Sequence, residues 1–197
     1  TYEDPIWSLG NHLKGTKKNP LKLEVYGLLG HHSLEYMHHV HARVIGEVPL
    51  GTGSHLTNCR LEIHGSVMGS QNLFIDHGIN SFYEIHSSTP IHGTVAHVSK
   101  RCEVICYADV ESIAVLGKKS RYTLYGNARY LIGTEKSCTI TVHGTVDKAH
   151  FPIGGTLIDK FKYGFENRIK YGSFNSLYET TDRDSFAMLY DSIGFFG

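Results

Sequence analysis

Apolar and polar residues alternate in seven short segments of this chain, and the segments recur about every 20 residues. Each one reads apolar, any, apolar, any, small, as in Leu61-Glu-Ile-His-Gly65. The small residues that close the segments are Gly27, Gly46, Gly65, Ser87, Cys106, Gly126 and Gly144, at steps of 19, 19, 22, 19, 20 and 18 residues. Alternation indicates a β-strand, and a repeat of this length is typical of a solenoid.

The pattern therefore predicts an all-β fold, a single-stranded parallel β-solenoid (β-helix) of about seven coils. A second apolar patch follows each strand and often ends in glycine, so each coil is expected to hold two or three strands joined by tight corners. Strands one coil apart would stack about 4.8 Å from each other. We expect the solenoid over residues 21–164.

The two ends are predicted to differ from the repeat and to act as irregular or helical caps, because stacked repeats need their open ends covered. Residues 1–20 are expected to form an N-terminal arm or cap, with at most a short helix near Trp7–Leu13. Lys160-Phe-Lys-Tyr-Gly164 places lysines where apolar residues belong and ends the pattern. Beyond it, Thr181-Asp-Arg-Asp184 precedes apolar residues at helical spacing, so we predict a C-terminal cap with a short helix over residues 165–197.

Stacking turns each outward position of the repeat into a column of side chains. A basic column is predicted from Lys22, His41, Arg60, Phe82, Arg101, Arg121 and Thr139. An acidic column is predicted from Glu24, Arg43, Glu62, Glu84, Glu103, Thr123 and Thr141. A ring-bearing column is predicted from Tyr26, Ile45, His64, His86, Ile105, Tyr125 and His143.

The acidic and ring columns supply the candidate binding face. Its predicted members are Tyr26, His64, His86, Tyr125, His143, Glu62, Glu84 and Glu103. Stacked carboxylates repel one another, so the acidic column is explained by ion pairs to the basic column, by a cation or substrate site that uses two carboxylates, or by a covering partner. The rings either stabilise the sheet or contact a protein or glycan.

Other candidate chemistry is weaker. Five histidines lie within segment 31–41, a density found in some transition-metal sites. No carboxylate or cysteine at recognisable ligand spacing completes a site, so we expect exposed loop histidines and neither metal nor cofactor. The four cysteines form no C-x-x-C pair and are expected to be buried free thiols.

Charge and composition argue against a nucleic-acid partner and against a membrane span. Lys plus Arg equals Asp plus Glu, 19 each, which argues against nucleic-acid binding by bulk charge. No apolar run is long enough to span a membrane as a helix. No recognised catalytic motif is present, so no catalytic residue is assigned.

Two segments, Val25-Tyr-Gly-Leu-Leu-Gly30 and Ile63-His-Gly-Ser-Val-Met-Gly69, combine a strand with closely placed glycines. Over about residues 21–155 the chain resembles the right-handed β-helix of the GXGXG type. That module is found at the C-terminal end of the glutamate synthase large chain and in formylmethanofuran dehydrogenase, where it forms one of the subunits. The resemblance implies a structural module that holds other domains in place, and it carries over no functional residue.

Three functions stay open at this point. The favoured one is a non-catalytic structural or assembly module that docks a partner, or another copy of itself, through a face of the solenoid. The second is a surface adhesin, phage-spike-like, or carbohydrate-binding or -degrading module that uses the acidic and aromatic columns. The third is a metal- or cluster-handling scaffold that uses the histidines with Cys102 and Cys106.

Overall fold

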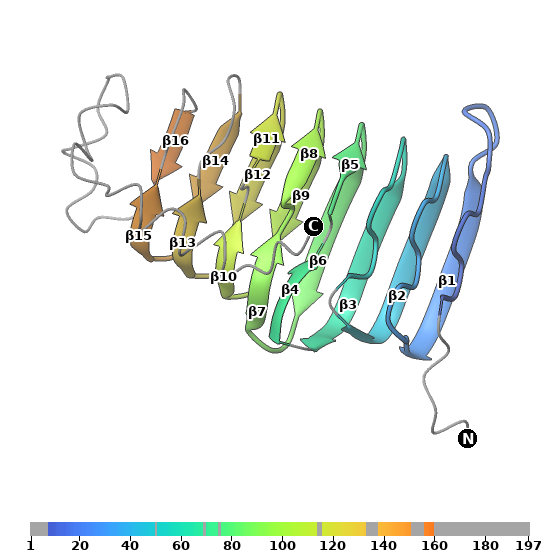
Figure 1. Cartoon of the computed structure of the whole chain (residues 1–197), viewed down its shortest axis with the longest axis horizontal. Helices are drawn as coiled ribbons and strands as arrows, with labels where there is room; N and C mark the ends of the chain where they lie inside the picture. The colour runs from blue at the N-terminus through green and yellow to red at the C-terminus, as the bar shows by residue number, and fades with distance from the viewer. Residues whose placement is uncertain are drawn as a thin grey trace.

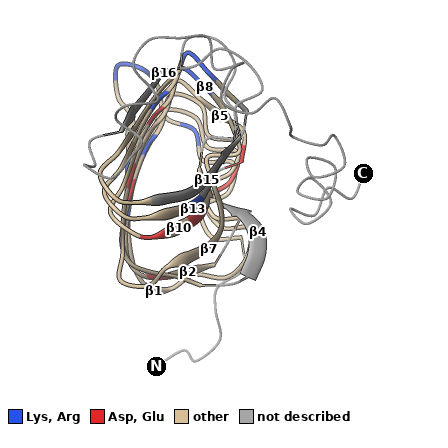
Figure 2. Cartoon of the chain, turned by 90° about the vertical axis from the view of Figure 1, so that its left-hand side faces the viewer, with Lys and Arg blue, Asp and Glu red and all other residues tan. Residues whose placement is uncertain are grey.

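The computed structural model describes residues 8–49, 51–68, 70–74, 76–113, 116–132, 138–150 and 156–159. Over these ranges the chain forms strands and turns with no helix, and every paired strand is parallel to its neighbours. The strands stack along one long axis (Figure 1), and seen along that axis successive coils superimpose as a closed loop (Figure 2). The all-β parallel solenoid predicted from the repeat is confirmed.

The seven predicted strands all belong to one eight-stranded sheet. In spatial order this sheet holds β1 (Leu21–Leu28), β2 (Val40–Pro49), β3 (Arg60–Met68), β6 (Phe82–Ser87), β9 (Glu103–Cys106), β12 (Arg121–Leu124), β14 (Thr139–Val142) and β16 (Thr156–Asp159). Gly46 pairs with Gly65, and Ile63 pairs with Ile85. Residues one coil apart are therefore direct neighbours, as the repeat requires.

Two smaller sheets complete each coil. A five-stranded sheet holds β4 (Ser70–Phe74), β7 (Ile91–Val95), β10 (Val110–Ile113), β13 (Ala128–Ile132) and β15 (Val146–His150). A three-stranded sheet holds β5 (Gly78–Ile79), β8 (Val98–Lys100) and β11 (Leu116–Lys118). Each described coil from β4 onwards thus contributes to two or three sheets around a central core.

The core is built from the two apolar positions of each strand. Inner neighbours on successive coils, such as Val44, Ile63 and Ile85, are almost fully buried. Burying each such side chain contributes roughly 1.5–3 kcal/mol. Among the residues whose burial is described, the two largest buried side chains are Tyr83 and Tyr122. All four cysteines are buried and none forms a disulfide, which confirms the prediction for them.

The fifth strand differs from its predicted register by two residues. Glu103 pairs with Phe82 and Arg121, and Cys106 pairs with Ile85, so Cys106 takes an inner apolar position instead of the small corner position. Ala108, two residues further along the chain, lies at the corner, where its carbonyl group is next to Gly126 on the following coil. A shift of two residues keeps the same side chains facing inward, and cysteine suits both an apolar and a small position. The pattern therefore could not separate the two registers.

The ends also depart from expectation. Residues 8–12 form turns instead of part of a helix, and they stack on the next coil through backbone hydrogen bonds such as His12 N–H to the Glu35 carbonyl. At the other end β16 adds an eighth rung, with Leu157 paired to Ile140, just before the segment 160–164 where the pattern ends. The predicted C-terminal cap, residues 165–197, lies outside the described residues. No helix in the described part of the chain has the length and apolar character to span a membrane.

Candidate functional site

The outward face of the eight-stranded sheet brings most of the predicted binding residues together. His64 pairs in register with His86, and the rings of His86, Tyr107, Tyr125 and His143 follow on successive coils. Tyr107 was not predicted: the corrected register places it in the column where Ile105 was expected. We call the five side chains His64, His86, Tyr107, Tyr125 and His143 the ring stack.

The rings of this stack are nearly parallel. Adjacent ring centroids lie 4.6, 4.3, 4.6 and 4.4 Å apart, and the interplanar angles are between 2° and 10°. Each inner ring therefore covers the face of its neighbours. Tyr107 and Tyr125 remain 42% and 48% exposed. The result is an ordered row of stacked rings from which the two tyrosines keep exposed surface.

Tyr26 lies in the same column but outside the stack. Ile45 separates it from His64, because Tyr26 pairs with Ile45 and Ile45 pairs with His64. Its hydroxyl donates a hydrogen bond of 3.0 Å to Glu24, and this bond raises the pKa of Tyr26. Tyr26 is 68% exposed, so it extends the face without sharing the order of the ring stack.

Two of the predicted carboxylates stand on adjacent rungs and share one arginine. Glu62 pairs with Glu84 in the sheet. The guanidinium of Arg60 lies 2.5 Å from a Glu62 oxygen and 3.4 Å from a Glu84 oxygen. The hydrogen bond from Arg60 lowers the pKa of Glu62. His86 Nε2 lies 3.1 Å from the other Glu84 oxygen, which links this pair to the ring stack.

The third predicted carboxylate belongs to a different column. Glu103 stands between Phe82 and Arg121, in the column predicted to be basic, and it pairs with Arg121 at 3.3 Å. Its expected place beside Glu84 is taken by Ile105. The acidic column therefore holds two adjacent glutamates instead of three. Arg60 also covers the ring of Phe82, with its central carbon 4.3 Å from the ring centroid.

These contacts decide what the face can do chemically. Glu62, Glu84 and Glu103 each have a cationic partner, so the like-charge repulsion of stacked glutamates is offset within the face. A carboxyl group that acts as a general acid needs a raised pKa, and Arg60 shifts the pKa of Glu62 in the opposite direction. The geometry thus favours a network of structural ion pairs over a pair of catalytic carboxylates.

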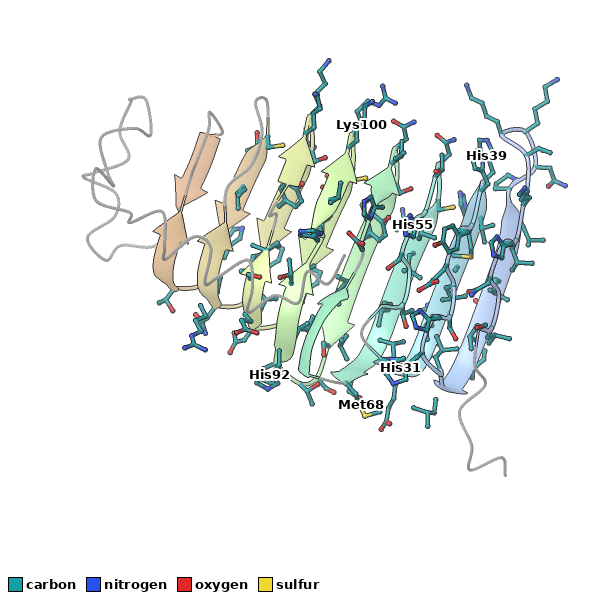
Figure 3. The ribbon with its side chains drawn as sticks, viewed as in Figure 1. His31, His39, His55, Met68, His92 and Lys100 are labelled. Carbon is teal, nitrogen blue, oxygen red and sulfur yellow. The ribbon has the colours of Figure 1, made fainter. Side chains whose placement is uncertain are left out.

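The histidine-rich segment 31–41 does not form one cluster. His31 and His39 lie at opposite ends of the coil (Figure 3). His32 contacts Glu35 with a nitrogen–oxygen distance of 3.1 Å, whereas His38 and His39 contact each other edge to face at the entry to β2. The chain between them separates the two groups, so the histidines that are close in the sequence do not lie together in the structure.

A different cluster, which the sequence did not reveal, joins Asp76 to three histidines. His77 Nδ1 and His97 Nδ1 lie 2.8 and 3.1 Å from the two Asp76 oxygens, and His97 is only 1% exposed. His55 stacks on His77, and ligand atoms of His55, Asp76 and His77 lie within 4.8 Å of one another. Burial acts to raise the pKa of Asp76, but the bonds and charges of His97 and His77 lower it overall.

This cluster has the donor types of a transition-metal site. The rings of His55 and His77 are parallel within 7° and 4.7 Å apart. Because an imidazole lone pair lies in the ring plane, two parallel rings direct their lone pairs within parallel planes, and one ring would have to rotate to share an ion. The arrangement observed is a hydrogen-bonded carboxylate–imidazole group. A spacing of 22 residues between His55 and His77 was the only signal for it in the sequence.

The fold and the face define a parallel β-solenoid with one ordered, ring-bearing side. Comparison of the chain with protein families, with curated proteins and with solved structures gave no match. The resemblance to the GXGXG type consequently stays a prediction.

Proposed function

We propose that this protein is a non-catalytic structural module that docks another protein, or a second copy of itself, through the outward face of its eight-stranded sheet. The observation that carries the proposal is the ring stack, five rings in register beside charges that are already paired within the face.

The side chains of this face are already ordered in the unbound protein, and this order favours a docking role. Tyrosine and arginine are among the residues that most often dominate protein interfaces. Side chains fixed by stacking and ion pairing lose little conformational entropy when a partner covers them. Tyr107, Tyr125 and Arg60 meet both conditions, because each is held by neighbours on adjacent coils and each keeps exposed surface.

The carbohydrate alternative has less support from the geometry. A sugar ring packs against the exposed face of an aromatic ring, and in the stack those faces are turned toward one another. Cleavage of a glycan by Glu62 and Glu84 would need one protonated carboxyl group. Changing Glu62→Gln and Glu84→Gln together should leave any glycan-degrading activity of the preparation unchanged, and loss of such activity would restore the carbohydrate alternative.

Light scattering across a range of protein concentrations tests the self-docking form of the proposal. If the partner is a second copy, the average mass should rise with concentration, and Tyr107→Ser with Tyr125→Ser should suppress the rise. Tyr36→Ser is the matched control, because Tyr36 is 46% exposed and lies in a separate group of stacked rings with His12 and His55. Equal loss in the control, or no loss in the double variant, would argue against docking through this face.

A further inference from the structure

A second row of stacked rings runs along another corner of the coil, and His55 marks its place in Figure 3. The rings belong to successive coils, with adjacent centroids 5.0, 4.5 and 4.7 Å apart: His12, Tyr36, His55 and His77. All four residues have a left-handed backbone, with φ between 55° and 60°, and all four side chains keep exposed surface. We call these four rings the corner row.

Asp76 places a carboxylate at the end of the corner row. It lies in the turn between β4 and β5, beside His97 in the turn between β7 and β8, because both pairs of strands are in register at the same offset. His97 Nδ1 lies 3.1 Å from one Asp76 oxygen, and His77 Nδ1 lies 2.8 Å from the other. The ring of His97 is almost fully buried, so it fixes the orientation of the carboxylate.

The distances between the donor atoms are close to those of a metal site. Ligand atoms of His55, Asp76 and His77 lie within 4.8 Å of one another. Bonds of about 2.0–2.1 Å to a four-coordinate Zn²⁺ ion place neighbouring ligand atoms about 3.4 Å apart. The three atoms therefore have to approach by no more than about 1.4 Å. The side chain of His77 is 50% exposed, so its ring can leave the parallel stack and turn toward the other two ligands without displacing the core.

A metal ion can replace the hydrogen bond between His77 and Asp76. A neutral imidazole has two tautomers. In one, Nδ1 carries the proton and donates it to the carboxylate, and in the other the proton is on Nε2 and Nδ1 offers a lone pair. Coordination through Nδ1 therefore needs only a change of tautomer, and the number of protons on the ring stays the same.

The ring stack contains a similar set of donors in a different electrostatic setting. His64 and His86 are stacked at 4.6 Å, and His86 Nε2 lies 3.1 Å from Glu84. The guanidinium of Arg60 also contacts that carboxylate group, at 3.4 Å. A guanidinium keeps its charge and repels a cation, whereas the imidazoles that contact Asp76 can be neutral near pH 7. The group around Asp76 is therefore the better cation site of the two.

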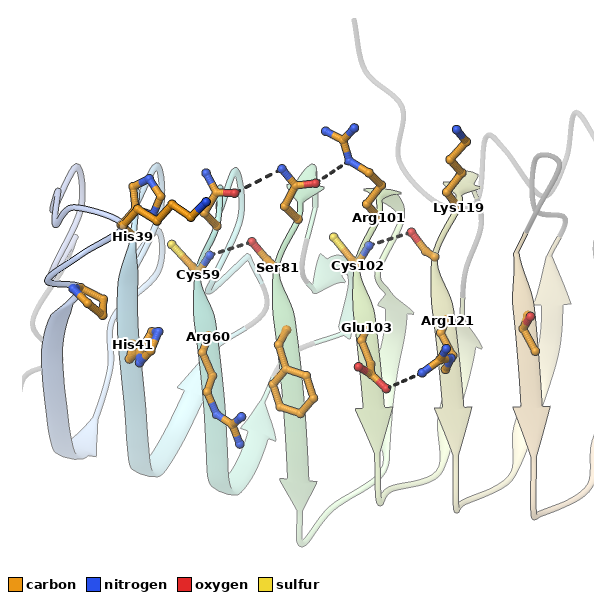
Figure 4. Close-up of a pocket in the computed structure, with 17 residues that line it drawn as sticks. His39, His41, Cys59, Arg60, Ser81, Arg101, Cys102, Glu103, Lys119 and Arg121 are labelled. Carbon is orange, nitrogen blue, oxygen red and sulfur yellow. Dashed lines mark hydrogen bonds and ion pairs between the residues drawn. The ribbon is translucent and has the colours of Figure 1, made fainter.

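The cysteines, the other ligand type that transition metals favour, are held elsewhere. Cys59 and Cys102 lie beneath the corner at which the coils enter the eight-stranded sheet, where their N–H groups donate to Ser81 and Ser120 (Figure 4). A thiol must lose its proton to bind a metal. Burial raises the pKa of the Cys59 and Cys102 thiols, and it raises that of Cys106 to about 12. These thiols are therefore poor candidates for metal ligands.

We propose that His55, Asp76 and His77 bind a divalent transition-metal ion such as Zn²⁺, and that the buried ring of His97 holds Asp76 in place for it. Three protein ligands leave the fourth tetrahedral position to water or to an added ligand. The ion joins two successive coils at a corner away from the ring stack, so this site does not depend on docking. The sequence gave no expectation of it, because the stacking of coils brings these ligands together.

Calorimetric titration of the chelator-treated full chain with Zn²⁺ tests the proposal. We expect one ion to bind per chain, and Co²⁺ bound in its place to show the visible absorption of a four-coordinate ion. His55→Asn and His77→Asn should each lower the affinity for Zn²⁺ about tenfold or more, since even the partners of metal ligands are worth that much. Asparagine is chosen because it tolerates the left-handed backbone of both positions.

His12→Asn is the matched control. His12 belongs to the same corner row and has the same left-handed backbone, but Tyr36 separates it from His55. The control variant should therefore bind Zn²⁺ as the parent does. An equal loss of affinity in the control, or parent-like affinity in both ligand variants, would overturn the proposal.

Modification of histidines in the parent protein by diethyl pyrocarbonate gives a readout that needs no variant, so the proposal stays testable if a variant fails to fold. Bound Zn²⁺ should protect His77, whose side chain is half exposed, and leave the exposed His12 as reactive as before. Absence of Zn²⁺ binding in the titration, or modification of His77 that is equal with and without Zn²⁺, would overturn the proposal.

Discussion

The eight-stranded sheet has two corners, and they are built on different constraints. At the exit corner the chain turns at a column of small residues, where a Cβ on Gly65 would collide with the Gly46 carbonyl group. At the entry corner the chain turns at residues with left-handed backbone, His39, Asn58, Asn80, Arg101 and Lys119, whose side chains leave the coil. At the exit corner the close backbone contact allows only a small residue. At the entry corner the side chain points outward and can be of any type, including a charged one.

Beneath the entry corner an inner column fixes the turn. The column alternates sulfur and oxygen on successive coils: Cys59, Ser81, Cys102, Ser120 and Cys138. Backbone N–H groups donate to it, as from Cys102 N to Ser120 Oγ at 3.1 Å and from Ser120 N to Cys138 Sγ at 3.4 Å. This buried polar ladder replaces the tight glycine contact of the exit corner, and it explains why the outward residue there is not restricted to one type.

The largest expected effect is at the exit corner. Gly65→Ala should lower the free energy of unfolding by about 3 kcal/mol or more, because the new Cβ meets backbone that cannot move aside. Gly27→Ala is the matched control: Gly27 lies in the same column, with φ of 109° and open space around the added Cβ. It should cost only the left-handed strain, about 1–2 kcal/mol. Denaturant unfolding of both variants measures the difference, and equal losses would refute the backbone contact.

An intermediate effect is expected in the inner column. Ser120→Ala removes the acceptor for the buried Cys102 N–H and should cost about 1–3 kcal/mol. Ser120→Cys should cost less, because Cys138 already accepts such a bond one coil further on. Thermal and denaturant unfolding check the order of the two variants. A cysteine variant as unstable as the alanine variant would show that packing, not the ladder of acceptors, decides this corner.

The smallest effect concerns pH and the ring stack. Burial, and then the charges of His86 and Arg43, lower the pKa of His64 below its ordinary 6.5. The unfolded chain therefore takes up this proton more readily than the folded one. The contribution of His64 to stability is fully present above pH 6.5 and decreases as pH falls through 6.5 toward the lower folded value.

Replacing His64→Phe keeps a ring in the stack and removes this titration. We expect the unfolding midpoint of the variant to depend less on pH than that of the parent between neutral and mildly acidic solution. Burial also lowers the pKa of His55, so part of the pH dependence should persist in the variant. An unchanged pH profile would show that His64 has the same pKa in both states.

The two corners also explain what could be predicted from the sequence. Small residues and alternating apolar residues mark the exit corner, so the strands, their parallel stacking and four of the five rings in the stack were predicted. The predicted register of the fifth strand was wrong because Cys106 fits both an inner apolar position and a small corner position. As a result Tyr107 was missed, and Glu103 was assigned to the wrong column. The entry corner leaves no such pattern, since its left-handed residues share a backbone conformation but no side-chain type. For the same reason the group around Asp76 became visible only in three dimensions.

A photo-crosslinking amino acid placed at Tyr125 or at Tyr36 tests docking through the ring stack most directly. The two tyrosines are 48% and 46% exposed, so they report on different surfaces with similar access. Docking through the ring stack predicts a discrete adduct from position 125, with the purified protein or in an extract of the source cells, that disappears when Tyr107→Ser is added. Adducts of equal yield from both positions, or from position 36 alone, would contradict it.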